Sequence, residues 1–238
     1  YREMAPGKAH RDMYLDDDGK VIPFKSLFGP LAAGIPGTVN GMWKAHQAHG
    51  SMSWERLVQP AVDLAHDGFI VPEKLATKIA RHIGRLESRD IQVNFKQHFK
   101  SATAGSLFKQ NDLAKTLARI RDQGPDGFYA GETAAIISDF MRREGGLINE
   151  QDLQRYDAKW RKPITAEWRG YTLVTSPPTS SGGIAVLQWL GMYDRVEKRL
   201  ARKFEHNSAE YMHVLAEAGK RVFADRAEYL GDPDFFEV

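Results

Sequence analysis

The spacing of apolar residues along the 238-residue chain predicts a helix-rich segment with one β-hairpin. Residues 1–36 carry turn signals and no regular period, whereas three- and four-residue spacing of apolar side chains begins at Gly37. Apolar and polar residues alternate in 164–168, and β-branched and aromatic residues resume in 171–174, so two strands are expected around a turn at Arg169-Gly170. The expected helices cover residues 37–50, 53–68, 72–86, 111–124, 133–144, 184–190 and 207–223, with a short turn at 149–156.

Because strands do not alternate with helices, the pattern favours an α+β fold over a parallel-sheet α/β domain. Polar residues that can cap a helix precede several of the periodic stretches, at Ser53, at Asn149 and at Asn207 or Ser208. Pro60 is expected to kink or restart its helix, since proline lacks the backbone donor. The least patterned and most polar stretch, 88–110, predicts a long or poorly ordered loop.

Composition narrows the class of protein. The absence of cysteine excludes disulfide scaffolds, zinc ribbons and cysteine nucleophiles. Lys and Arg number 33 against 31 Asp and Glu, so no strong field points to nucleic acid. No apolar run approaches the roughly 18 residues of a membrane-spanning helix, and the N-terminus shows no signal-peptide pattern. The chain starts without methionine and reads as the middle of a longer protein.

The motifs that would make a self-sufficient enzyme are absent, including GxSxG, HExxH and the phosphate-binding GxxxxGK[ST]. His46 and His49 could share a helix face, but no nearby carboxylate completes a metal set, so we interpret them as ordinary helix residues. The run 16–18 of aspartates lacks calcium-loop spacing and predicts a polar turn instead.

Four further features allow a functional or a structural interpretation. The glycine-rich run Gly34–Gly41 precedes a helix, and tight packing there is favoured over anion binding. The loop Ser176–Gly183 suits either a substrate-facing turn or a packed helix cap. Arg226 is expected to form a structural ion pair with Asp225 or Asp232. Arg2 is either a solvated surface residue or a clamp for a planar carboxylate, since its fork donates two parallel hydrogen bonds.

Seven stretches of the chain occur in an order that is specific when they are taken together. They are Tyr1–Pro6, Gly34–Gly41, Val58–Ala61 with Gly68-Phe69, Gly124–Tyr129, Gly145–Ile148 with Asp152, Leu153 and Tyr156, Pro177–Gly183, and Ala224–Phe235. This set resembles the γ-glutamyltransferase (γ-glutamyl transpeptidase, glutathione hydrolase) family, and specifically the middle and later part of its large subunit. The resemblance covers essentially the whole chain.

The resemblance implies an N-terminal-nucleophile hydrolase with a four-layer αββα sandwich. Such a precursor cleaves itself, and the new N-terminal threonine of the small subunit attacks a γ-glutamyl amide to form an ester. Water, an amino acid or a peptide then accepts the γ-glutamyl group, without a metal or an organic cofactor. In the family, the arginine of the YRE-type motif binds the α-carboxylate, which corresponds to Arg2 here. The resemblance assigns no catalytic residue to this chain, and it implies a periplasmic or extracellular address.

Residues 1–238 are accordingly expected to be an incomplete domain of the large subunit, with the small subunit of the same precursor as its partner. We expect its apolar faces to meet strands that this chain lacks, and we expect the segment alone to be inactive. Two alternatives stay open. The parent could be a cephalosporin or glutaryl acylase of the same fold, or the chain could be a non-catalytic helical interaction module.

Overall fold

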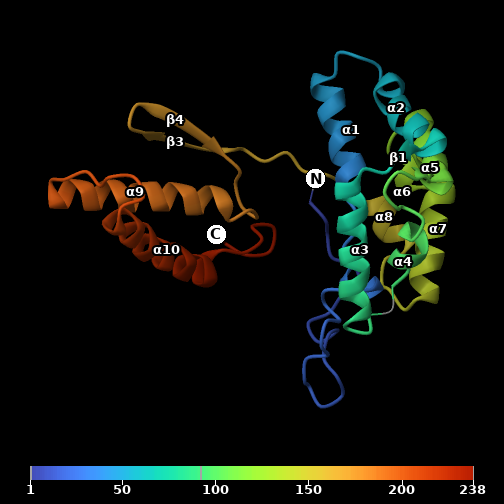
Figure 1. The fold of residues 1–238 in the computed structure, drawn as a ribbon, viewed down its shortest axis with the longest axis horizontal. Coiled ribbons are helices and arrows are strands. Elements are labelled where there is room, and N and C mark those ends of the chain that lie inside the picture. The colour runs from blue at the N-terminus through green and yellow to red at the C-terminus, as the bar shows by residue number, and fades with distance from the viewer. Residues whose placement is uncertain (1, 92, 238) are drawn as a thin grey trace. The chain divides into compact units, whose positions relative to one another are not determined.

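The structure, a computed structural model that describes residues 2–91 and 93–237, contains two compact units. Unit 1 comprises Tyr1–Lys159 and unit 2 comprises Trp160–Val238; each is described by itself below. Figure 1 labels their helices and strands. Among the described residues, no helix combines the length and the apolar character needed to cross a membrane.

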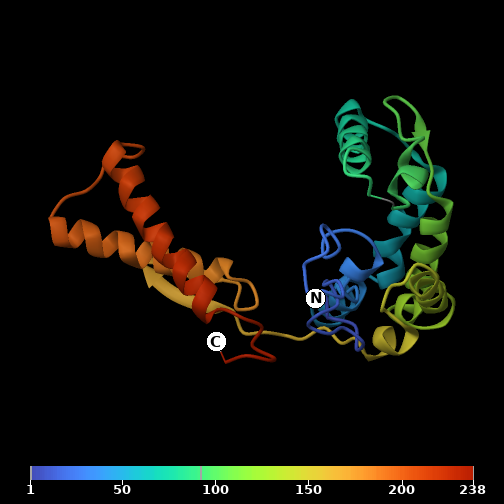
Figure 2. The ribbon, with the colours of Figure 1, turned by 90° about the horizontal axis from the view of Figure 1, so that it is seen from below.

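Unit 1 is a helical assembly with one two-stranded sheet, preceded by an irregular N-terminal segment (Figures 1 and 2). The strands β1 and β2 pair antiparallel, with Phe69 opposite Phe108. The elements are a 3-10 turn Pro30–Ala32, α1 Thr38–His49, α2 Trp54–Asp67, β1 Phe69–Ile70, α3 Glu73–Glu87, α4 Phe95–Phe99, β2 Leu107–Phe108, α5 Asn111–Gln123, α6 Asp126–Tyr129, α7 Gly131–Arg143 and α8 Glu150–Arg155.

Most helix boundaries in unit 1 confirm the sequence signals. Ser53 caps α2, because its hydroxyl accepts a hydrogen bond from the Arg56 amide at 3.4 Å. The helix ends at Gly68, whose φ of 84° suits glycine. Asn149 and Asp152 form a reciprocal capping box at the start of α8. The local chemistry of caps and glycines therefore fixes where these helices begin and end.

Pro60 lies inside α2, and the helix runs through it as one element from Trp54 to Asp67. Proline leaves the carbonyl one turn back, at Arg56, without its helical donor. Both residues are exposed, so water can satisfy that carbonyl. The helix is also held from outside, because α2 packs along α5 and the buried Trp54 indole donates to the Ile120 carbonyl at 2.8 Å. Tertiary packing thus carries the helix across its proline.

The prediction of a long loop over 88–110 is wrong. This stretch contains α4 and β2, and four of its apolar residues join a small core with β1 and α3. Phe95 and Phe99 stack with ring centroids 4.6 Å apart, and Phe99 lies 5.8 Å from Phe108. A five-residue helix and a two-residue strand are too short to show a period, so the polar residues between the aromatics dominated the sequence pattern.

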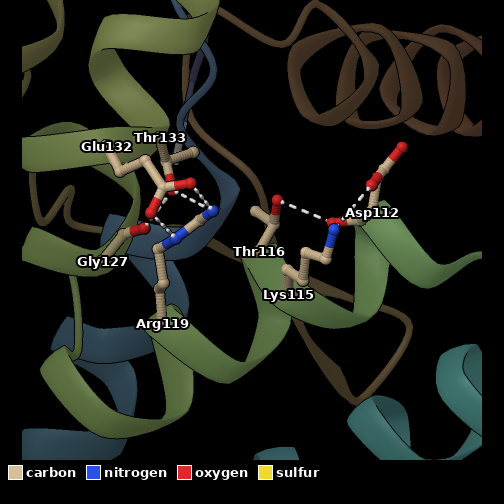
Figure 3. Close-up of polar contacts among 7 residues, drawn as sticks. All are labelled: Asp112, Lys115, Thr116, Arg119, Gly127, Glu132 and Thr133. Carbon is tan, nitrogen blue, oxygen red and sulfur yellow. Dashed lines mark hydrogen bonds and ion pairs between the residues drawn. The ribbon is translucent and has the colours of Figure 1, made fainter.

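A polar network joins α5, α6 and α7 (Figure 3). The Arg119 guanidinium donates to both carboxylate oxygens of Glu132, at 3.2 and 2.5 Å, and to the Thr133 hydroxyl at 3.1 Å. The buried Thr133 hydroxyl in turn donates to the Gly127 carbonyl at 2.7 Å. Each polar group is satisfied by a group on another helix, so the network fixes the corner that the chain makes between α5 and α7.

Unit 2 consists of a β-hairpin and two long helices (Figures 1 and 2). The elements are β3 Ile164–Trp168, β4 Tyr171–Thr175, α9 Gly182–Leu200 and α10 Ala209–Tyr229. The predicted hairpin is confirmed, with Trp168 opposite Tyr171 across a two-residue turn. Arg169 and Gly170 both have positive φ, at 51° and 83°, as a tight hairpin turn requires. Arg169 bonds Asp194 and Glu197 on α9, which holds the turn against the helix.

The spacing of Met212, Val222 and Phe223 in the sequence predicts one buried apolar face of α10, and this prediction is wrong in part. Val222 is buried, but Met212 and Phe223 are more than half exposed. Ser208, and not Asn207, caps the helix by accepting from the Tyr211 amide at 3.2 Å. The two helices are joined by the Trp189 indole, which donates to the Leu215 carbonyl at 2.8 Å.

We predict that Arg119→Lys lowers the free energy of unfolding by about 1–2 kcal/mol, because an ammonium cannot reproduce the fork that reaches both Glu132 oxygens and Thr133. Urea unfolding followed by circular dichroism measures this change. Lys115→Met is the matched control. Within the described part of the chain, Lys115 on the same helix pairs only with exposed Asp112 (Figure 3), so the change should alter stability by no more than about 0.5 kcal/mol. Equal losses in the two variants would contradict the assigned role of the network.

Candidate functional site

The N-terminal segment around Arg2 is bound to unit 1 through its backbone. Met4 and Ile35 exchange hydrogen bonds in both directions, from the Met4 amide at 3.4 Å and from the Ile35 amide at 2.8 Å. The Tyr156 hydroxyl donates to the Arg2 carbonyl at 2.5 Å. Tyr1 lies outside the described residues. The main chain of Arg2 is therefore fixed from a point 154 positions further along the sequence.

Tyr156 is itself held by a second tyrosine. The rings of Tyr129 and Tyr156 stack with centroids 5.5 Å apart and an interplanar angle of 7°. The Tyr129 hydroxyl donates to the Pro36 carbonyl at 2.8 Å and accepts from the Asn40 amide at 3.3 Å. Both tyrosines belong to the main core of unit 1 and are only 5% exposed. The pair therefore connects the start of α1 with the backbone of Arg2.

Two glycines allow the N-terminal segment to approach the start of α1. A Cβ atom on Gly37 would lie within 3 Å of the Tyr156 hydroxyl and of the Arg2 carbonyl oxygen. A Cβ atom on Gly34 would lie 3.1 Å from the Glu3 side chain. The packing interpretation of the Gly34–Gly41 run is thus confirmed, and its packing partner is the Arg2 segment.

The α8 region completes the attachment. Asp152, which caps α8, also accepts from the Gly7 amide at 2.9 Å. Asn40 accepts from the Ala158 amide at 2.9 Å, and Lys44 donates to the Ala158 carbonyl at 2.6 Å. Residues on both sides of Tyr156 are thereby tied to α1 or to the N-terminal segment.

We call this assembly the Arg2 clasp and define it as Arg2, Met4, Ile35, Tyr129 and Tyr156. Arg2 is exposed, and among the described residues its side chain has neither a hydrogen bond nor an ion pair. Its backbone is fixed while its guanidinium stays available. A guanidinium in that condition can bind a carboxylate through two parallel hydrogen bonds.

Burial keeps the two phenols of the clasp protonated. Desolvation raises the pKa of Tyr129 to about 12, against a usual value of 10.0, and the neighbouring Tyr156 adds to the rise, while the hydrogen bond from the Asn40 amide opposes it. Desolvation also raises the pKa of Tyr156, helped by the negative charges of Glu3 and Asp157. Both hydroxyls therefore remain hydrogen-bond donors to a higher pH than exposed tyrosines do.

The other candidate residues have structural roles. The Asp16 carboxylate accepts from the amides of Asp18 and Lys20, at 3.1 and 2.8 Å, which confirms the polar turn. His46 is half-buried and bonds the Met52 carbonyl at 2.7 Å. Across the described ranges, no group of three or more His, Asp or Glu side chains could hold a metal ion.

The predicted ion pair of Arg226 is wrong. Arg226 donates to the Ser181 hydroxyl at 3.0 Å, and Asp225 accepts from Gln188 at 2.9 Å, so Arg226 reaches the N-cap of α9 and Asp225 reaches its second turn. Adjacent residues of a helix do not face each other, which disfavours an ion pair between Asp225 and Arg226. Both side chains instead meet residues outside α10. Within the Ser176–Gly183 loop, the Ser180 hydroxyl accepts from the Gly182 amide at 3.3 Å. The loop is thus held by one internal hydrogen bond and by one hydrogen bond from α10.

Comparison with known proteins identifies the family. A family model described as Gamma-glutamyltranspeptidase matches residues 1–238. The chain belongs to the γ-glutamyltranspeptidase family. It is 48% identical to the Glutathione hydrolase proenzyme of Pseudomonas aeruginosa, over 100% of this chain and 42% of that protein. It also matches the solved γ-glutamyltranspeptidase of Pseudomonas nitroreducens complexed with L-DON, with 47% identity and a TM-score of 0.93, over 100% of this chain and 70% of that one.

Relatives with other names are more distant. The Acylase ACY 1 proenzyme of a Pseudomonas species is 34% identical, over 98% of this chain and 43% of that protein. The chain spans about 42% of the length of the curated relatives that it matches. Its helix-rich structure with small sheets agrees with neighbours that are γ-glutamyltranspeptidases.

The sequence motifs name Arg2 as a candidate and give no role to Tyr129 or Tyr156. Both tyrosines lie within motifs of the family resemblance, Tyr156 after Asp152 and Leu153 and Tyr129 at the end of Gly124–Tyr129. A combination of two glycine-containing turns and two tyrosines in the sequence is the signal that points to them. A buried tyrosine hydroxyl needs a hydrogen-bond partner, and a glycine lets another stretch of backbone come close enough to provide one.

We predict that Tyr129 makes stability depend on pH above 10. The folded state holds the proton of Tyr129 up to a pKa of about 12, while the unfolded state loses it near 10. The contribution is complete below pH 10 and is lost as the pH rises towards 12. In unfolding experiments from pH 8 to 12, the stability advantage of the unsubstituted chain over Tyr129→Phe should stay constant to pH 10 and then shrink. An advantage that is constant to pH 12 would show that Tyr129 ionises freely in the fold.

Proposed function

We propose that this chain is the large-subunit segment of a γ-glutamyltransferase, or glutathione hydrolase, in which Arg2 binds the α-carboxylate of the γ-glutamyl group. One observation carries the proposal: the Arg2 backbone is clasped while its guanidinium is exposed and has no partner among the described residues. Family membership supplies the substrate class, since relatives across the whole chain are named glutathione hydrolase proenzymes.

In the proposed reaction the threonine hydroxyl of a small subunit attacks the γ-carbonyl of the donor. The threonine α-amine takes the proton of the hydroxyl and passes it to the departing amine as the amide bond breaks. A γ-glutamyl ester on the threonine remains. Water or the amine of an amino acid or peptide then attacks the ester and frees the threonine. Arg2 acts on the substrate end that does not react. By orienting the α-carboxylate it places the γ-carbonyl before the nucleophile.

The remaining expectations for the whole protein are proposals that rest on the same family membership. The partner is the small subunit of the same precursor, and the substrates are glutathione and other γ-glutamyl compounds. The complete fold is an αββα sandwich to which residues 1–238 contribute outer helices and a hairpin. The proposed address is periplasmic or extracellular.

We predict that Arg2→Lys in the complete, processed protein lowers kcat/KM for glutathione about 30- to 150-fold, mainly through KM. An ammonium cannot donate the two parallel hydrogen bonds, and a charge-assisted pair of this kind contributes about 2–3 kcal/mol. Initial rates over a range of glutathione concentrations measure the change.

An exposed arginine outside the clasp provides the control, and Arg11→Lys should leave KM unchanged. An unchanged KM in Arg2→Lys would reject the clamp. A parallel assay on glutaryl amides tests the acylase alternative, because a glutaryl group lacks the α-carboxylate; faster turnover of glutaryl amides than of glutathione would favour that function.

We also predict that residues 1–238 alone do not turn over γ-glutamyl-p-nitroanilide, since the proposed nucleophile belongs to the small subunit. Release of p-nitroaniline by the purified chain, above that of a heat-denatured sample, would place a nucleophile within this segment and contradict the proposal. A parent protein without a threonine-led second subunit would instead favour the helical interaction module.

A further inference from the structure

We infer that Tyr156 is a positioning residue for substrate binding: through its hydrogen bond to the Arg2 carbonyl, it sets the direction in which the guanidinium leaves the backbone. The inference rests on the proposed function of Arg2 and assigns a new role to a buried residue that does not touch the substrate. The bond joins the Tyr156 hydroxyl and the Arg2 carbonyl oxygen at 2.5 Å.

The Arg2 backbone is fixed by two sets of hydrogen bonds. Two hydrogen bonds between Met4 and Ile35 fix the chain two residues further on, but they leave the peptide that follows Arg2 free to rotate. The Tyr156 hydroxyl holds the carbonyl of that peptide. Because the side chain starts at the same Cα atom, fixing this carbonyl limits where the guanidinium fork can point. Bidentate recognition of a carboxylate depends strongly on that direction.

Tyr156 is held rigidly by the core of unit 1. Its ring is 5% exposed and stacks on Tyr129, whose own hydroxyl is held by Pro36 and Asn40. The backbone amide of Tyr156 bonds the Leu153 carbonyl at 3.1 Å, at the end of α8. Leu153 is fully buried. The donor is therefore anchored in the core of unit 1, and little of its position depends on Arg2.

The space around the hydrogen bond between Tyr156 and Arg2 is left open by a glycine. Gly37 lies against both the Tyr156 hydroxyl and the Arg2 carbonyl oxygen, so no side chain separates them. The Tyr156 phenol is protonated and a hydrogen-bond donor at neutral pH, and burial raises its pKa further. A phenylalanine would keep the stacked ring and lose only this donor, so the substitution isolates the bond.

The test uses Tyr156→Phe in the complete, processed protein. We expect KM for glutathione to rise about three- to tenfold, as the loss of one neutral hydrogen bond implies, with kcat within twofold of the unsubstituted enzyme. Tyr14→Phe is the matched control. Tyr14 is in the same N-terminal segment and donates to the Leu31 carbonyl at 3.0 Å, a comparable bond with no connection to Arg2. Its KM should not change.

Two further measurements separate positioning from general structural damage. In an Arg2→Met background, Tyr156→Phe should have no additional effect on kcat/KM, because the residue acts through the guanidinium. On a 4-aminobutanoyl amide, which keeps the amine and lacks the α-carboxylate, Tyr156→Phe should be as active as the unsubstituted enzyme. Multiplicative effects in the double variant, or equal losses on both substrates, would overturn the inference, as would a Tyr156→Phe protein that fails to fold or mature.

The proposed function fails in a different way. If Arg2→Met itself left KM for glutathione unchanged, the carboxylate clamp would be wrong whatever Tyr156→Phe did. If Arg2→Met raised KM and Tyr156→Phe did not, the clamp would stand and only the positioning role would be rejected.

Discussion

The hydrogen bond from Tyr156 to the Arg2 carbonyl is the contact on which the organisation of unit 1 around its N-terminal segment depends. It joins positions 154 residues apart and is partly buried. Gly37 leaves room for it, Tyr129 supports the donor, and the pairing of Met4 with Ile35 brings the acceptor within reach. An exposed chain segment would otherwise adopt many conformations, and the bond removes that freedom where a substrate-binding side chain needs a fixed base.

Buried tyrosines suit this task for a physical reason. A phenol contributes apolar area to the core and carries one donor at its tip, which must be satisfied when it is buried. Tyr129 and Tyr156 each give that donor to a backbone carbonyl, at Pro36 and Arg2. Both phenols are neutral at physiological pH, and their raised pKa values extend that range, so these two side chains add no charge that would compete with an incoming carboxylate for the guanidinium of Arg2.

The sequence predicted the features of the fold that local chemistry controls. The helix caps at Ser53 and Asn149 and the tight turn with positive φ at Arg169-Gly170 are confirmed by the structure. For features that depend on contacts between residues distant in sequence, the predictions were absent or wrong. The elements α4 and β2 are too short for a period and form because Phe95, Phe99 and Phe108 reach one small core. For the candidate site, Arg2 could be named from a motif, whereas the bond that fixes it joins the two ends of unit 1 and leaves no local pattern.

The central claim is that a clasped backbone presents the Arg2 guanidinium to the α-carboxylate of a γ-glutamyl group. A crystal structure of the complete, processed protein with bound glutamate tests it most directly. The account predicts two guanidinium nitrogens of Arg2 at about 2.7–2.9 Å from the two α-carboxylate oxygens, with the Tyr156 bond to the Arg2 carbonyl intact. An α-carboxylate held by other residues, with the Arg2 side chain directed into solvent, would contradict it.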